Sequence, residues 1–142
     1  MRDLVLDNIL GKELIGIEED GSVKELRLKF KEGVLRCYHL HYCCGAFVYL
    51  GKESSNLGVV AEASLESTHF LDKEDYRELR KLPKDISCYL RPQELNNRDY
   101  TLTILKLIFL EGTNNTFKFF KKANSEYYKT VQLKWLTSNC NV

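Results

Sequence analysis

The 142-residue sequence lacks most of the motifs by which enzymes are recognised. It contains no glycine-rich phosphate loop, no dinucleotide-binding fingerprint, no nucleophile elbow and no His-Glu metalloprotease helix. It also has no paired Cys-x-x-Cys knuckle, which excludes the usual zinc-finger and zinc-ribbon patterns. These absences favour a protein that binds something over a protein that catalyses a reaction.

An excess of one charge and long apolar runs are also missing. Lys plus Arg is 21 and Asp plus Glu is 20, so the net charge of +1 gives no reason to expect binding to long nucleic acid. The first 14 residues are interrupted by charges, and we therefore expect neither a secretory signal, nor a transmembrane segment, nor a membrane partner. We expect a cytoplasmic protein in which the five cysteines, an odd number, stay reduced.

The hydrophobic pattern predicts one domain, residues 1–142, that is rich in strands. Residues 24–30 alternate between apolar and charged side chains, which is typical of a strand with one wet face. We predict further strands at 14–18, 34–41, 46–52, 59–66, 100–113, 116–122 and 127–136. The period changes to that of a helix over 71–82, which Pro83 ends. The predicted fold class is α+β: a mostly antiparallel, strongly curved or barrel-like sheet with one main helix, residues 71–82.

One short stretch concentrates residues that can hold a metal ion. On a strand, Cys37, His39 and His41 share a face, and thiolate and imidazole groups suit zinc. A fourth ligand is available in Cys43, Cys44 or Cys88. The spacing matches no known zinc module, and a buried Cys37 with histidines at a strand end accounts for the pattern equally. We therefore predict no metal ion and no cofactor.

The same stretch holds a possible thiol nucleophile. Cys43 or Cys44 lies near His41 as a base, and Gly45 leaves a backbone N–H for an oxyanion. No known local signature surrounds the cysteine pair, and small thiols also fill space under tight turns. We predict no catalytic residue, and a small metal- or thiol-dependent enzyme remains an alternative.

Basic residues interleaved with aromatic ones form the remaining signal. Arg36 and Tyr38 share the strand face opposite Cys37. We expect a second group in a C-terminal hairpin: Lys118, Lys121, Lys122, Tyr127, Tyr128, Lys129 and Lys134. Arginine and lysine bind phosphate and aromatic rings stack on bases, so this pattern indicates a pocket for a nucleotide-like anion. Lysine on an exposed strand also protects against edge pairing, which is the simpler interpretation.

Several segments occur in an order that resembles an uncharacterised family of small phage and bacterial proteins. Tyr38, His39 and the Cys43–Cys44 doublet match its first motif. Its last motif is matched by Asn124, Tyr127 and Tyr128. The sequence departs from the family at Tyr42, at Ser125–Glu126 and by the insertion of the 71–82 helix. The resemblance implies a small phage accessory protein and no known activity.

These observations lead to one main hypothesis: a non-enzymatic phage or prophage protein that counters host defence by sequestering a nucleotide-derived immune signal in the host cytoplasm. The predicted ligand-binding residues are Arg36, Tyr38, His39, His41, Lys121, Lys122, Tyr127, Tyr128 and Lys129. A homo-oligomer with the ligand between chains is one assembly that this hypothesis allows. The alternative partner is a host protein, with this chain as a protein–protein inhibitor of a defence enzyme.

Overall fold

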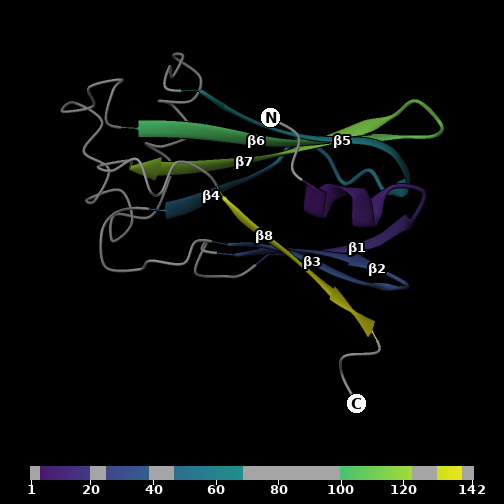
Figure 1. Ribbon diagram of the computed structural model, residues 1–142. Coiled ribbons are helices and arrows are strands. Elements are labelled where there is room, and N and C mark those ends of the chain that lie inside the picture. The colour runs from purple at the N-terminus through teal and green to yellow at the C-terminus, as the bar shows by residue number, and fades with distance from the viewer. Residues whose placement is uncertain (1–3, 20–24, 39–46, 69–99, 123–130, 139–142) are drawn as a thin grey trace.

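The computed structural model describes residues 4–19, 25–38, 47–68, 100–122 and 131–138. These residues form a short 3₁₀ helix and eight strands joined into one antiparallel sheet (Figure 1). In chain order the elements are η1 (Leu4–Ile9), β1 (Glu13–Glu19), β2 (Leu26–Phe30), β3 (Gly33–Tyr38), β4 (Phe47–Lys52), β5 (Gly58–Thr68), β6 (Tyr100–Phe109), β7 (Asn114–Lys122) and β8 (Gln132–Thr137). The strand order across the sheet is β4-β7-β6-β5-β1-β2-β3-β8.

The first three strands form an antiparallel meander. In β2 and β3 buried and partly exposed residues alternate, so each strand turns one face to the core and one to the outside. The turn between them is two residues long and places Phe30 opposite Gly33. This pairing sets the register of the whole hairpin, since a one-residue slip would send every core side chain to the outer face.

The sheet bends into two layers where β5 meets β1. The first residues of β5, Gly58 and Val59, pair with β1, while Val60 and the residues after it pair with β6. Figure 1 shows β5, β6 and β7 above β1, β2, β3 and β8, with η1 at the side where it contacts β5 and β8. The core between the layers is built mainly from leucines and phenylalanines, including the fully buried Leu28, Phe117 and Phe119.

Strand β8 approaches β3 closely because residue 33 is a glycine. A β-carbon at Gly33 would lie 2.8 Å from Cζ2 of Trp135 and in collision with the carbonyl oxygen of Leu136. By contrast, a β-carbon at Gly16 would meet its nearest neighbour, Cβ of Lys29, at an ordinary 3.7 Å. The pairing of β8 with β3 therefore depends on the glycine that closes the β2–β3 turn.

A buried amide anchors the loop that leads into β5. Asn115 is fully buried at the start of β7, and its Oδ1 accepts a hydrogen bond from the backbone N–H of Ser54 at 3.1 Å. Its Nδ2 donates to the carbonyl oxygen of Ser54 at 2.9 Å. Both ends of the amide are thus satisfied inside the protein, which fixes residues 53–57 against β7.

The predicted mostly antiparallel sheet is confirmed, but three details of the expected architecture are not. In the part of the chain that the structure describes, the sheet has two ends, β4 and β8, that do not pair with each other, so it is open and not barrel-like. The predicted C-terminal hairpin is wrong, because β7 pairs with β4 and β6 whereas β8 pairs with β3. The main helix predicted over residues 71–82 lies outside the described residues. Within the described residues the only helical segment is the short η1.

Within those residues the structure contains no helix with the length and hydropathy that crossing a bilayer requires.

Candidate anion-binding face

Three cationic residues lie in one row across the outer face of β2, β3 and β8. Arg27 is paired directly with Arg36, and Arg36 is paired on its other side with Lys134. Glu18 of β1 extends the row, because it is paired with Arg27. Directly opposed residues have β-carbons about 5 Å apart, so the three cations occupy one narrow strip of surface. We call Arg27, Arg36 and Lys134 the cation row.

Two members of the cation row share one buried carboxylate. Glu25 is only 7% exposed. Its Oε1 accepts hydrogen bonds from Nε of Arg36 at 3.1 Å and from Nη2 of the same residue. Its Oε2 lies 2.6 Å from Nε of Arg27. Glu25 therefore offsets the repulsion between two guanidinium groups that the strand register forces together.

An aromatic ring lies beside the middle member of the row. The guanidinium carbon of Arg36 lies 4.8 Å from the ring centre of Tyr38, two residues further along the same face of β3. This is cation–π distance, and the contact holds both side chains in place. Arg36 and Tyr38 share the face opposite Cys37, as the sequence predicts.

The carboxylates around the row leave it with a positive balance. Glu18 forms ion pairs with Nη1 of Arg27 at 2.9 Å and with Nζ of Lys29 at 2.5 Å. The hydrogen bond from Lys29 and then that from Arg27 hold the pKa of the Glu18 carboxyl below its ordinary value. Among the residues that the structure describes here, four cations (the row and Lys29) face two carboxylates (Glu18 and Glu25), a balance of two positive charges.

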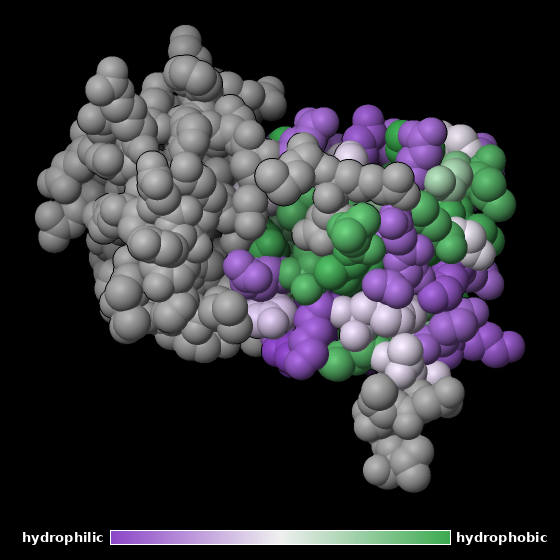
Figure 2. Space-filling model, in the orientation of Figure 1, coloured by the Kyte–Doolittle hydropathy of each residue, from purple (hydrophilic) through white to green (hydrophobic). Residues whose placement is uncertain are grey.

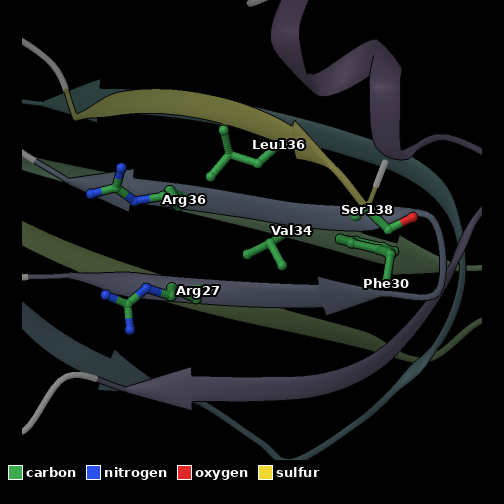
Figure 3. Close-up of a pocket in the computed structure, with 7 residues that line it drawn as sticks. Arg27, Phe30, Val34, Arg36, Leu136 and Ser138 are labelled. Carbon is green, nitrogen blue, oxygen red and sulfur yellow. The ribbon is translucent and has the colours of Figure 1, made fainter. Parts of the chain in front are cut away.

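A hollow of about 250 Å³ opens beside the row, at the end of β3 nearest the β2–β3 turn. Its apolar surface comes from Val34 and Leu136, which are direct cross-strand partners, and from Phe30. Figure 3 shows these two side chains between the guanidinium groups of Arg27 and Arg36 on one side and Ser138 on the other. The outer face of β2, β3 and β8 thus offers a cationic strip next to an apolar one.

Exposed leucines mark a different surface, at the end of the molecule where β5 begins. The backbone N–H of Gly11 donates to the carbonyl oxygen of Val60 at 2.8 Å, and that of Leu110 donates to the carbonyl oxygen of Val59 at 2.9 Å. These bonds bring the segments after η1 and after β6 to the start of β5, and Figure 2 shows hydrophobic side chains at this end. The exposed leucines here are Leu10, Leu57 and Leu110.

The structure separates the residues that the sequence groups into one basic site. Arg36 and Tyr38 lie together, and Lys134 joins them from β8. Lys121 and Lys122 lie in β7, in the other half of the sheet, where their backbones pair with β4 and β6. They are not neighbours of Arg36 within the sheet.

The other predicted ligand-binding residues, His39, His41, Tyr127, Tyr128 and Lys129, lie outside the described residues.

Cys37 belongs to the core, in agreement with the simpler interpretation of the cysteine- and histidine-rich stretch. It is fully buried, and burial, followed by the nearby Glu25 carboxylate, raises the pKa of its thiol far above the ordinary value. Such a thiol stays protonated and unreactive. Across the described ranges, no three His, Cys, Asp or Glu side chains gather closely enough to hold a metal ion.

Sequence reasoning missed the roles of Glu25 and Arg27. The alternation in residues 24–30 places both on the wet face of a strand and predicts nothing more specific. The available signal was the length of the turn after Phe30: counting back from a two-residue turn places Arg27 opposite Arg36. The contribution of Lys134 had no such signal, because β8 joins β3 from almost 100 residues further along the chain.

No protein family, no curated protein and no solved structure matches this chain.

Proposed function

We propose that this chain is a non-enzymatic binding protein that holds a small, phosphate-bearing, nucleotide-like ligand on the outer face of β2, β3 and β8. The cation row is the observation that carries the proposal. Arginine and lysine are the residues that bind phosphate, and aromatic side chains beside them are typical of nucleotide recognition. Arg27, Arg36, Lys134 and Tyr38 supply both groups within one strip.

Preorganisation supports a binding role for this strip. Arg36 is held by the carboxylate of Glu25 and by the ring of Tyr38, and Arg27 is held by Glu25 and Glu18. Side chains that are already fixed lose little rotamer entropy when a ligand binds. Lys134 is exposed and forms no ion pair with any residue that the structure describes, so its ammonium group is available to an anion.

The biological role that fits such a site best is sequestration of a nucleotide-derived immune signal by a phage or prophage accessory protein. This part of the proposal draws on the sequence resemblance to small phage and bacterial proteins. It also agrees with the local character of the charge: a chain with a net charge of +1 has no long-range attraction for nucleic acid, whereas a strip with a balance of two positive charges attracts a small anion.

The test is native mass spectrometry of the full chain incubated with a panel of mononucleotides, linear and cyclic dinucleotides and nucleotide-derived signals. We expect at least one bound mass, and we expect Lys134→Gln to weaken that complex about tenfold, the change that losing one charge-assisted contact produces. Lys106→Gln, an exposed lysine on β6, is the matched control and should bind like the wild type. A panel without any binder would refute the proposal.

A second function, inhibition of a host protein by direct contact, is favoured by the exposed leucines at the start of β5. Leu110 is 72% exposed, and exposed apolar clusters commonly mark protein interfaces. A pull-down from host lysate with the wild type and with Leu57→Ser/Leu110→Ser tests it. Recovery of one specific protein by the wild type and its loss in the variant would support this function, and equal recovery by both would contradict it.

A further inference from the structure

The apolar strip beside the cation row suggests which kind of phosphate-bearing ligand the face accepts. Val34 and Leu136 pair with each other in one row of the outer face, and Arg36 and Lys134 pair in the next row on the same face. Two residues along a strand span about 6.6–6.8 Å. The apolar row and the cationic row therefore run side by side, separated by about the distance between the two ends of a small ligand.

The apolar row borders the hollow of about 250 Å³, which leaves room above these two side chains. Both are only partly buried, so each has surface that a ligand can cover. Figure 3 shows them pointing out of the sheet beside Arg36, with Ser138 at the far side as a hydroxyl group. A flat ring that lies on Val34 and Leu136 would have one edge at the hydroxyl group of Ser138. A substituent on its opposite edge would point toward the cations.

The charge balance limits how many phosphates the face can neutralise. Counted over the described residues, the row and Lys29 carry a balance of two positive charges, because Glu18 and Glu25 offset two of the four cations. A phosphate monoester carries about −1.5 to −2 at pH 7, so one phosphate matches this balance. Further phosphates would bring excess negative charge toward the half-exposed Glu18 carboxylate, whose pKa is held below its ordinary value by its hydrogen bonds with Lys29 and Arg27.

From these three observations we infer that the face recognises a nucleoside monophosphate or a ligand of the same plan, a flat aromatic ring carrying one phosphate. The ring lies on Val34 and Leu136, and the phosphate lies at Arg36 and Lys134. This inference rests on the proposed function, because it assigns the ligand's two ends to the two rows of the same face. A purely apolar partner would leave the cation row unused, and inorganic phosphate would leave the apolar row unused.

Isothermal titration of the full chain at fixed ionic strength tests the inference with AMP, GMP, CMP and UMP, with the matching nucleosides, with ATP and with inorganic phosphate. We expect at least one monophosphate to bind about tenfold or more tightly than its nucleoside and than inorganic phosphate, since the ligand gains both rows. ATP should bind no more tightly than AMP.

Two variants locate the ring. Leu136→Ser and Val34→Ser should each weaken monophosphate binding about five- to tenfold through lost apolar contact, without changing the affinity for inorganic phosphate. Leu110→Ser is the control, because it removes an exposed leucine that does not line the hollow. Thermal unfolding of each variant verifies that it is folded. If Leu136→Ser does not fold, the binding affinity of Val34→Ser alone tests the position of the ring.

The outcomes separate this inference from the proposed function. If a nucleotide binds and Lys134→Gln weakens it while Val34→Ser and Leu136→Ser do not, the anion site stands and the ring position is refuted. If ATP binds much more tightly than every monophosphate, the single-phosphate assignment is refuted. If none of these ligands and no member of the wider nucleotide panel binds, both the inference and the proposed function fail.

Discussion

The carboxylate shared by Arg27 and Arg36 makes Glu25→Gln the most informative substitution in the protein. Glutamine keeps the shape of the side chain and removes only its charge. The two guanidinium groups would then remain directly opposed across β2 and β3 without the carboxylate that they share in the wild type. We expect this change to lower stability, because the buried carboxylate loses its charge between two cations.

The magnitude follows from burial and distance. Two opposite charges 4 Å apart attract each other by about 4 kcal/mol at an effective dielectric constant of 20 and by about 1 kcal/mol in water. The Glu25 side chain is 9% exposed, but those of Arg36 and Arg27 are 31% and 39% exposed, so the lower half of this range applies. Allowing for the hydrogen bond that glutamine still accepts, we expect a loss of about 2 kcal/mol, or about 4–8 °C in Tm for a domain of this size.

Urea unfolding monitored by circular dichroism measures this loss, with Glu62→Gln, an exposed residue of β5, as the control. A second substitution provides the sharper test, because the shared carboxylate predicts that it raises the stability of the Glu25→Gln variant. Adding Arg27→Gln to Glu25→Gln removes one of the two repelling charges and should restore about 1 kcal/mol of stability. If Glu25→Gln lies within 0.5 kcal/mol of the wild type, an ordinary value for a surface change, or if Arg27→Gln destabilises it further, the shared-carboxylate explanation is wrong.

Three further predictions concern the fold around the candidate face. Gly33→Ala should cost about 2–3 kcal/mol in urea unfolding because its β-carbon would collide with β8, whereas Gly16→Ala, which meets no such contact, should stay close to the wild type; equal costs would contradict the steric argument. Asn115→Ala should cost about 2 kcal/mol through three lost side-chain hydrogen bonds, and exposed Asn114→Ala under about 0.5 kcal/mol. The lowered pKa of Glu18 means that its stabilisation is present above the ordinary value of 4.5 and is lost as the pH falls through the lowered value, so Tm should fall less steeply below pH 4.5 in Glu18→Gln than in the wild type.

Much of the fold could be predicted because local patterns determine it. Alternation in residues 24–30 defines β2 and its two faces, and the short turn after Phe30 defines the partner and register of β3. The strands β4 to β7 likewise appear as apolar, β-branched or aromatic runs bounded by polar loops. These features depend on residues close together in the chain, and sequence reasoning is most secure there.

The pairing of β8 could not be predicted in the same way. Consecutive strands usually lie side by side, so β7 and β8 are expected to form a hairpin. Instead β8 crosses to β3, and Lys134 leaves the basic group expected around β7 to join Arg36. Two physical facts permit this: Gly33 admits the backbone of β8, and Leu133 and Trp135 add their side chains to the core. Both act across long sequence separations, which a local pattern does not record.

The same long-range pairing supports the proposal that the cation row binds a ligand and does not only stabilise the sheet. Like charges directly opposite each other on neighbouring strands destabilise a sheet. Glu25 offsets this cost for Arg27 and Arg36, but β8 then places Lys134 beside Arg36 with no carboxylate bound to it among the described residues. A neutral residue at position 134 would serve the sheet better. Lys134→Gln should therefore raise the free energy of unfolding slightly while it weakens binding of a phosphate-bearing ligand, and this opposition between stability and binding is the property that distinguishes a binding residue from a solvated surface lysine.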